Sequence, residues 1–355
     1  ANLVTLFFFY ELLTLVTYPL VTHHGTEEAR RAGRVYLGIL LATSILFLLP
    51  AIIVTWILTG TTDFRPGGIL SGRVDAATAG VLLALFMFGI GKAALMPFHR
   101  WLPAAMVAPT PVSALLHAVA VVKAGVFCVI KVIVYVFGID TLASLGGSAP
   151  FTAIAAFTLV AASVVALRAD NLKRRLAYST VSQLAYVSLA CSLFTPAAIM
   201  GATLHLVAHA FGKITLFFAA GSIYTAAHKT EVSQLDGIGR AMPWTMAAFG
   251  LGALSMIGLP PMAGFVSKWF ILSGAMAARD WVVVAALAAS TLLNAAYFLP
   301  IVYRAFFVAP APGDGHGHEA PAPMVLAQVA TAGACVALFL SPGLAIAFAR
   351  AVAGG

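Results

Sequence analysis

The chain has 355 residues, of which 61% are hydrophobic and 9% are charged, whereas a soluble globular domain carries about 25% charged residues. This composition excludes an ordinary soluble domain and indicates that lipid surrounds most of the chain. The formal net charge is +8, but the Lys and Arg residues are scattered singly or lie in short loops, which excludes a nucleic-acid-binding surface. Basic loops on the cytoplasmic side of a membrane explain the excess charge.

We expect about ten transmembrane helices, because a helix needs roughly 20 apolar residues to cross a bilayer. The expected spans are 2–22, 36–60, 75–97, 110–138, 149–168, 176–194, 196–226, 242–275, 281–307 and 323–349. Several of these segments are longer than a straight span requires, so tilted or broken helices are expected among them. The chain begins at Ala1, already inside an apolar run and without a signal peptide, which suggests a truncated N-terminus.

Two of the spans should be broken helices. The helix that starts near residue 75 meets Pro97 and then an amphipathic stretch, and the helix that starts near residue 242 contains Pro260 and Pro261 in its middle. Proline removes a backbone donor and disrupts the hydrogen-bond ladder of a helix. The predicted fold class is therefore all-α, a polytopic membrane protein with about ten transmembrane helices, two of them broken.

The distribution of basic residues predicts the orientation. The loops after the odd-numbered spans carry eleven Lys and Arg residues, and the loops after the even-numbered spans, with the tail, carry four. Because the more basic loops face the cytoplasm, we expect both ends of this chain outside. The expected location is a bacterial inner membrane, which the chain crosses many times.

No cofactor is expected. Cys128, Cys191 and Cys335 lie singly in apolar runs, so they are interpreted as buried small hydrophobic residues. The sequence contains neither a G-x-x-x-x-G-K-[ST] nor a GxGxxG motif, so an ion gradient or a partner subunit should supply the energy. The Gly-rich loop at 309–323 contains His316 and His318, which are not expected to bind a metal specifically, because further ligands are absent.

The membrane segments retain a small set of titratable residues. A charge at the bilayer centre costs at least about 2.5 kcal/mol, so a set of this size requires a functional reason. The set consists of Glu11, Lys92, His117, Lys123, Lys131, His205, His209, Lys213 and Lys268.

These residues do not all have the same interpretation. Lys131 lies in the last third of its helix and is expected to extend toward the membrane surface. His117 fits a neutral core histidine as well as a functional one. His205, His209 and Lys213 are spaced at i, i+4 and i+8, which places all three on one helix face and indicates a proton relay.

The remaining four residues are expected to carry function. Lys92 and Lys268 each lie beside a break in their own helix, and such breaks free backbone carbonyls at membrane depth. Glu11 is the one acid in the middle of a span and the natural partner of such a lysine, because a carboxylate stabilises a buried ammonium. Lys123 is the next buried base.

Two long motifs resemble a known family. The run from Gly91 to Ala118, with Lys92, Pro97 and His117, resembles the signature of the antiporter-like proton-translocating subunits of respiratory complex I, membrane-bound hydrogenases and Mrp-type Na⁺/H⁺ antiporters. The motifs around His205–Lys213 and Gly264–Lys268 fit the same family. The resemblance implies about fourteen helices with two inverted five-helix repeats, each containing one broken helix. The ten spans here look like the fifth to fourteenth, so the first four are lacking.

The resemblance also implies a division of the chain and a role for each residue. Residues 1–138 would be the remainder of the first inverted repeat, 139–307 the second, and 308–355 a polar loop with a final transmembrane helix. Glu11 would pair with Lys92. Lys123 and Lys213, with His205 and His209, would form the central relay, and Lys268 would be the terminal lysine.

The expected function is that of a subunit of a multisubunit Na⁺ or K⁺/proton antiporter. The residues at 21–26 and 121–125 look most similar to those of the D-type component of Mrp antiporters. The expected partners are other membrane subunits. The alternative is a proton-pumping subunit of NADH-quinone oxidoreductase (complex I) or of a hydrogenase; only then would the chain belong to an enzyme. A purely structural scaffold is disfavoured, because the buried bases outnumber the single buried acid.

Overall fold

A computed structural model of the chain describes residues 2–310 and 318–354. His316, from the predicted polar loop, lies outside the described residues. His318 is described, and its Nδ1 lies 3.0 Å from the carbonyl oxygen of Glu319.

The described part of the chain is helical, with no named strand. The helices are α1 (Leu3–Val21), α2 (Glu27–Thr43), α3 (Leu49–Thr59), α4 (Ala76–Gly89), α5 (Trp101–Ala104), α6 (Thr110–Ala114), α7 (Val121–Val132), α8 (Ile139–Leu145), α9 (Ala149–Arg168), α10 (Leu172–Cys191), α11 (Pro196–Ala227), α12 (Ile238–Ala241), α13 (Pro243–Ile257), α14 (Ala263–Ala277), α15 (Trp281–Phe307), α16 (Ala322–Leu340) and α17 (Gly343–Ala353). Short π-helical segments at Ser44–Leu48, Leu115–Val119 and Ile133–Phe137 join or extend some of these helices.

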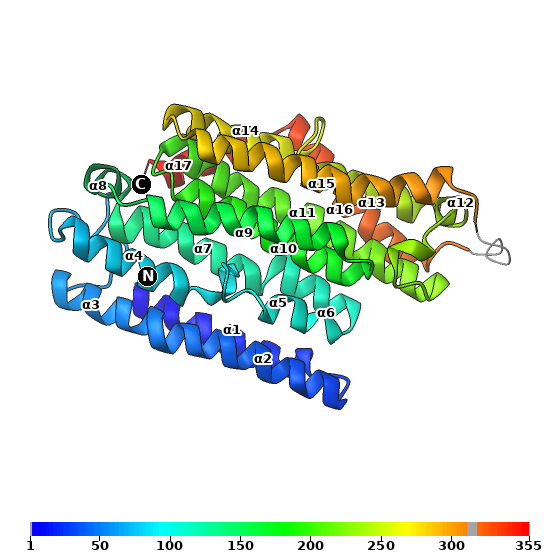
Figure 1. The fold of residues 1–355 in the computed structure, drawn as a ribbon, viewed down its shortest axis with the longest axis horizontal. Helices are drawn as coiled ribbons and strands as arrows, with labels where there is room; N and C mark the ends of the chain where they lie inside the picture. Colours follow the sequence, from blue (N-terminus) through cyan, green and yellow to red (C-terminus); the bar gives the residue numbers. More distant parts are fainter. Residues whose placement is uncertain (1, 311–317, 355) are drawn as a thin grey trace.

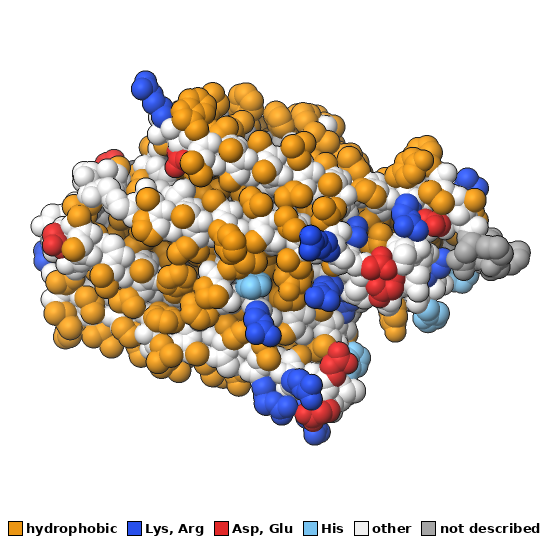
Figure 2. Space-filling model, viewed as in Figure 1, with side chains coloured by type: hydrophobic (Ala, Val, Ile, Leu, Met, Phe, Trp, Pro, Cys, Tyr) orange, Lys and Arg blue, Asp and Glu red, His pale blue; other side chains and the backbone are white. Residues whose placement is uncertain are grey.

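The long helices run side by side along the longest axis of the molecule (Figure 1). The chain advances from one edge of this bundle, formed by α1 to α3, through α7, α9, α10 and α11 in the middle to α13–α16 at the other edge. Both termini lie toward the same end. Hydrophobic side chains cover most of the visible face, and charged side chains gather toward one end (Figure 2). A band of apolar surface with charge at its end is the pattern that a lipid environment requires.

Seven helical stretches among the described residues are long and apolar enough to cross a membrane, and each corresponds to an expected span. The other three expected spans, 75–97, 176–194 and 242–275, correspond to α4 with the segment after it, to α10, and to α13 with α14. The predicted class, an all-α polytopic membrane protein, is confirmed. The second span begins earlier than expected, because Thr26 caps α2 by accepting a hydrogen bond from the backbone of Ala29.

Both predicted breaks exist, but the first lies earlier than Pro97. Helix α4 ends at Gly89, and Lys92 lies inside the break in a 3-10 turn, Gly91–Ala93. Glycine permits the break at this place, because a Cβ on Gly91 would lie 2.2 Å from Thr43 Oγ1. The second break falls where it was expected: α13 ends at Gly258, which has a φ of +90°, and α14 begins at Ala263.

The sequence did not predict two further interruptions. In the span 110–138, Ala120 adopts φ −100° and ψ −79° between a π-helical segment and α7. The final span is divided by Ser341 and Pro342 into α16 and α17. The first interruption was missed because no proline or glycine marks it; the π-helical turn that produces it contains His117.

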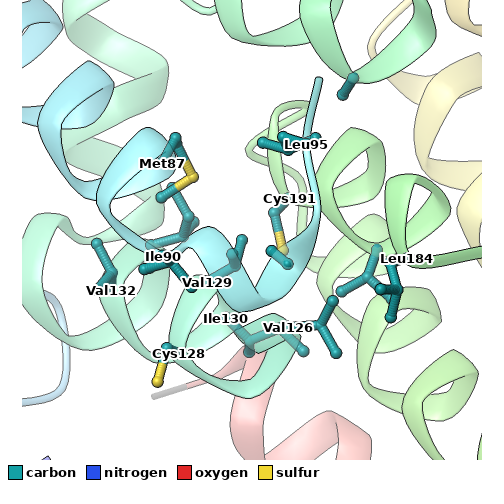
Figure 3. Packing of buried hydrophobic residues seen from close by; sticks show 14 of the residues in the cluster. Met87, Ile90, Leu95, Val126, Cys128, Val129, Ile130, Val132, Leu184 and Cys191 are labelled. Atoms are coloured by element: carbon teal, nitrogen blue, oxygen red, sulfur yellow. The ribbon is translucent and has the colours of Figure 1, made fainter. Parts of the chain in front are cut away.

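A large apolar cluster surrounds the first break. Figure 3 shows side chains from the end of α4 packed with those of α7 and, on the far side of the cluster, α10. Cys128 and Cys191 belong to this cluster, and all three cysteines are free and buried, as predicted. The packing is close enough that Gly125 of α7 touches the backbone of Lys92: a Cβ there would lie 2.3 Å from the Lys92 carbonyl carbon.

We predict that Gly125→Ala destabilises the protein, because a methyl group at this position must displace the backbone of the break. The measurement is the Tm of the purified protein in detergent. Gly80→Ala is the matched control, since a Cβ at Gly80 of α4 meets nothing within 4 Å, and alanine favours a helix by about 1 kcal/mol. An equal Tm for both variants would contradict the close contact.

Candidate functional site

The titratable residues predicted from the sequence lie along the interior of the bundle. Lys92, His117, Lys123, His205, His209 and Lys213 are buried, and Glu11 and Lys268 are half-buried. The structure brings them together in three groups: one at the first helix break, one where α7 meets α11, and one at the second break.

The first group joins α1 to the turn that holds Lys92. The Lys92 ammonium donates a hydrogen bond to the carbonyl oxygen of Tyr10 and lies 3.3 Å from the centre of the Tyr10 ring. The Lys92 backbone N–H donates to the Tyr10 hydroxyl at 3.0 Å. Contacts to one tyrosine therefore fix both the backbone and the side chain of this lysine.

Glu11 follows Tyr10 in α1, and Tyr10 is the residue that the Lys92 ammonium contacts. No described hydrogen bond joins the Glu11 carboxyl group to Lys92, so their partnership stays a prediction. Both carboxyl oxygens of Glu11 are buried without a hydrogen-bond partner among the described residues. A buried carboxyl group left in this way retains its full capacity to accept a proton or to bind water.

The second group forms where α7 and α11 meet. The Lys123 ammonium hydrogen-bonds to Nδ1 of His209, although the two residues lie 86 positions apart in the sequence. One turn away, the His205 ring lies 6.1 Å from that of His209, and His205 Nδ1 is 2.9 Å from the hydroxyl of Ser267. Both Nε2 atoms have no hydrogen-bond partner in the described structure.

Lys213 is the third residue on the predicted face of α11, and it contacts α10 rather than α7 or α14. Its ammonium donates to the hydroxyl of Ser179 and, at 3.2 Å, to the carbonyl oxygen of Leu176, both on α10. The i, i+4, i+8 spacing therefore gives one helix face whose members reach α7, α14 and α10.

The third group lies at the second break. The Lys268 ammonium donates to the carbonyl oxygens of Met256 at 2.9 Å and Ile257 at 3.0 Å. These are carbonyls at the end of α13, which the break leaves without helical partners. At this site the end of a broken helix thus supplies two carbonyl oxygens to the half-buried Lys268.

The Met256 carbonyl has more donors than a carbonyl can fully bond. Besides Lys268, the amide nitrogens of Gln183 and Asn294 approach it at 3.3 and 3.4 Å. A carbonyl oxygen has two lone pairs, so three donors share it. If the Lys268 ammonium moves away, two amides remain to satisfy the carbonyl, and the end of the helix is not left unpaired.

Sequence reasoning missed several polar residues that hold these groups. They are Tyr10, Ser179, Gln183, Tyr186, Ser267 and Asn294. A usable signal existed for Asn294, a lone amide in the middle of an apolar span, and for Ser267, which is part of the Gly264–Lys268 motif. The tyrosines gave no such signal, because an aromatic residue in a membrane helix is ordinary.

His117 and Lys131 lie outside the three groups. His117 is buried, neither of its ring nitrogens has a hydrogen-bond partner in the described structure, and its ring centre is 5.3 Å from that of Phe217. Lys131, in the last turn of α7, places its ammonium 4.5 Å and 4.1 Å from the ring centres of Phe64 and Tyr135. The expectation that Lys131 reaches the membrane surface stays a prediction.

A cavity of about 680 Å³ opens on the other side of Phe217. Its walls come from the start of α6, the second half of α11 and the start of α16, and they include Lys173, Tyr224 and Met324. Phe217 thus lines this cavity and also lies against the buried ring of His117.

Residues 1–294 match the family described as "NADH:quinone oxidoreductase/Mrp antiporter, TM". The chain belongs to this family. The membership predicted from the motifs is therefore confirmed.

Individual relatives come from several kinds of complex. The chain is 35% identical to NADH-quinone oxidoreductase subunit N of Desulforudis audaxviator, an alignment that covers 86% of this chain and 61% of the relative. It is 34% identical to hydrogenase-4 component B of Escherichia coli, over 74% of this chain and 40% of the relative. Among solved structures, the Mrp complex from Dietzia sp. DQ12-45-1b matches with a TM-score of 0.84 and 31% identity, over 99% of this chain and 38% of that one. The chain thus spans about three fifths or less of the length of these proteins.

We predict that Ser267→Ala weakens the contact between α14 and α11, because His205 Nδ1 loses its partner. A buried polar atom left unpaired costs about 1–3 kcal/mol, so the Tm should fall. Ser273→Ala on the same helix is the control, since the Ser273 hydroxyl donates to the carbonyl of Trp269 in its own helix. Equal stability of the two variants would argue against the His205–Ser267 hydrogen bond.

Proposed function

We propose that this chain forms a proton path across a membrane as one member of a multisubunit complex. The hydrogen bond between Lys123 and His209 is the observation that carries the proposal, because it joins two buried bases from distant parts of the sequence. Proton transfer needs groups within hydrogen-bond reach, directly or through a water molecule. A buried lysine and an imidazole in direct contact meet that requirement.

The proposed path runs through Glu11, Lys92, Lys123, His209, Lys213 and Lys268, with His205 linking α11 to α14. Its members are titratable groups inside one helix bundle, most of them buried. Coulomb interactions are strong where water is scarce, so protonation of one member biases the next. His117 belongs to the path as its member nearest the surface cavity.

We propose that proton movement along this path is coupled to exchange of Na⁺ or K⁺ in an Mrp-type antiporter. The similarity to the Mrp complex over 99% of this chain supports it, as does the resemblance of the 21–26 and 121–125 segments to the D-type component of such antiporters. The protein would then lie in a bacterial inner membrane with both ends of this chain outside. Residues 1–138 would form the remainder of the first inverted repeat and 139–307 the second, each with one broken helix.

A redox-driven proton pump is the second candidate. The names of the relatives favour it, since NADH-quinone oxidoreductase subunit N and hydrogenase-4 component B both align with most of this chain. The same proton path would serve an antiporter or a redox-driven pump. The two candidates differ in the partner subunits that couple proton movement to its energy source.

We expect Lys92→Ala to abolish proton transport in the assembled complex, because the ammonium that contacts Tyr10 at the first helix break is lost. The assay is the pH gradient across everted vesicles from antiporter-deficient cells that express the full-length protein with its neighbouring subunits, followed with a fluorescent amine. Lys131→Ala is the control, because Lys131 lies outside the three groups. Transport that persists in Lys92→Ala would contradict the path.

The same vesicles discriminate between the two candidates. Addition of Na⁺ or K⁺ to energised vesicles should collapse the pH gradient if the complex is an antiporter, and Glu11→Ala and Lys123→Ala should lose this response. If a correctly assembled wild-type complex ignores both cations, while quinone- or hydrogen-dependent proton pumping disappears on deletion of the gene, the redox-driven pump is the function.

The cavity beside Phe217 should be the aqueous opening of the path. A cysteine at Thr225, which lines the cavity, should react with a charged, membrane-impermeant thiol reagent from the cytoplasmic side. Ser222→Cys is the matched control, because Ser222 lies on α11 but is fully buried outside the cavity lining, and the native cysteines are buried. Labelling of Thr225→Cys from the opposite side would reverse the proposed orientation.

A further inference from the structure

The lysines at the two helix breaks share a feature that the sequence did not predict. The Lys92 ammonium lies 3.3 Å from the centre of the Tyr10 ring, and the Lys268 ammonium lies 4.2 Å from that of Tyr186. Both tyrosines are buried, with 3% and 0% of their surface exposed. Each break lysine therefore has the face of a buried aromatic ring beside it.

The two tyrosines occupy related places in the chain. Tyr10 lies in α1, the first expected span, and Tyr186 lies in α10, the sixth. In each half, the broken helix that carries the lysine comes two expected spans after the helix that carries the tyrosine. The arrangement of ring and ammonium thus occurs twice, on separate elements.

The face of an aromatic ring carries partial negative charge and attracts a cation, more strongly when both are removed from water. A buried ammonium needs such partners, because its transfer from water is costly when it is unpaired. The ring offers attraction without a proton-accepting carboxylate. It can therefore stabilise the charged form of a lysine without taking its proton.

The two halves differ in their acids. Glu11 follows Tyr10, whereas Val187 follows Tyr186, and α10 contains no acidic residue. The Lys268 ammonium has the carbonyls of Met256 and Ile257 and the ring of Tyr186 around it. The ring is consequently the principal non-backbone partner of the Lys268 charge in the described structure.

Tyr186 also contacts the next member of the path. Its ring centre is 5.5 Å from that of His205, and its hydroxyl is 3.5 Å from that of Thr291. The ring thus touches both Lys268 and His205, which belong to different helices. The face of this ring is therefore close enough to interact with a positive charge on either group.

We propose that Tyr186 is a positioning residue for proton transport: its ring holds the Lys268 ammonium, for which α10 supplies no acid, as the Tyr10 ring holds Lys92 next to Glu11 of α1. This inference rests on the proposed proton path. It adds a residue that the motifs did not mark, and it assigns the function to the ring rather than to the hydroxyl.

The test compares Tyr186→Phe with Tyr186→Leu in everted vesicles that contain the full complex. Tyr186→Phe keeps the ring and should retain at least about half of the wild-type transport rate. Tyr186→Leu keeps an apolar side chain without a ring, and transport should fall about tenfold. Phe137→Leu is the control for loss of a buried ring, because Phe137 is buried and packs against Phe86 rather than a cation.

A pH profile separates this role from simple packing. In Tyr186→Leu the pH at which transport is half-maximal should move roughly one unit lower, because the ammonium form loses a stabilising contact. The titratable groups that the described contacts place beside Lys268 are Tyr186 of α10, whose ring centre is 4.2 Å from the ammonium, and His205 of α11, whose ring centre is 5.5 Å from that of Tyr186. Phe137→Leu should leave the profile unchanged.

Three outcomes would overturn the proposal: normal rate and pH profile in an assembled Tyr186→Leu complex, equal inactivity of Tyr186→Phe and Tyr186→Leu, or the same pH shift in Phe137→Leu. Lys268→Ala distinguishes this failure from failure of the proton path. If Lys268→Ala transports normally, the path itself is wrong at this position. If Lys268→Ala is inactive while Tyr186→Leu is normal, the proton path stands and only the proposed role of the Tyr186 ring is contradicted.

Discussion

The free energy required to hold ammonium groups inside a membrane is the constraint on which the rest of this structure depends. An unpaired charge at the bilayer centre is costly, and the described buried lysines have few acids near them. The structure compensates with backbone carbonyls and aromatic rings. Lys268 uses the carbonyls at the end of α13, and Lys92 uses that of Tyr10, each beside a ring face. These partners stabilise a charge without fixing it in a salt bridge.

The same constraint explains where glycine is needed. A broken helix exposes polar backbone, which has to be covered by close packing in a medium that offers no water. Gly125 lets α7 approach the backbone of Lys92, and Gly264 lets α14 approach α13, where a Cβ would lie 1.7 Å from the carbonyl oxygen of Ser255. These contacts place Lys123 near the first break and Lys268 near the second. The same glycine contacts therefore both pack the helices closely and place the lysines beside the breaks.

The shared carbonyl of Met256 keeps the end of α13 hydrogen-bonded whether or not Lys268 donates to it. Lys268, Gln183 and Asn294 all donate to it, so no single donor is essential to the end of α13. A lysine held in a single strong ion pair would be difficult to release, because breaking a buried pair leaves an uncompensated charge. The central Lys123–His209 contact is likewise not an ion pair, because it joins two bases.

The sequence by itself determined the membrane class, the order of the spans, the presence of two broken helices and most of the buried titratable residues, because hydrophobic length, proline chemistry and the rarity of intramembrane charge are local properties. It also placed His205, His209 and Lys213 on one helix face. It missed Arg175, which is buried at the start of α10. Only the tertiary structure decided that Lys123 meets His209 across 86 positions, that α4 ends at Gly89, and that Tyr10 and Tyr186 lie against the break lysines. These facts depend on which helices pack together and at what height, and contacts between distant segments leave no periodic trace in the sequence.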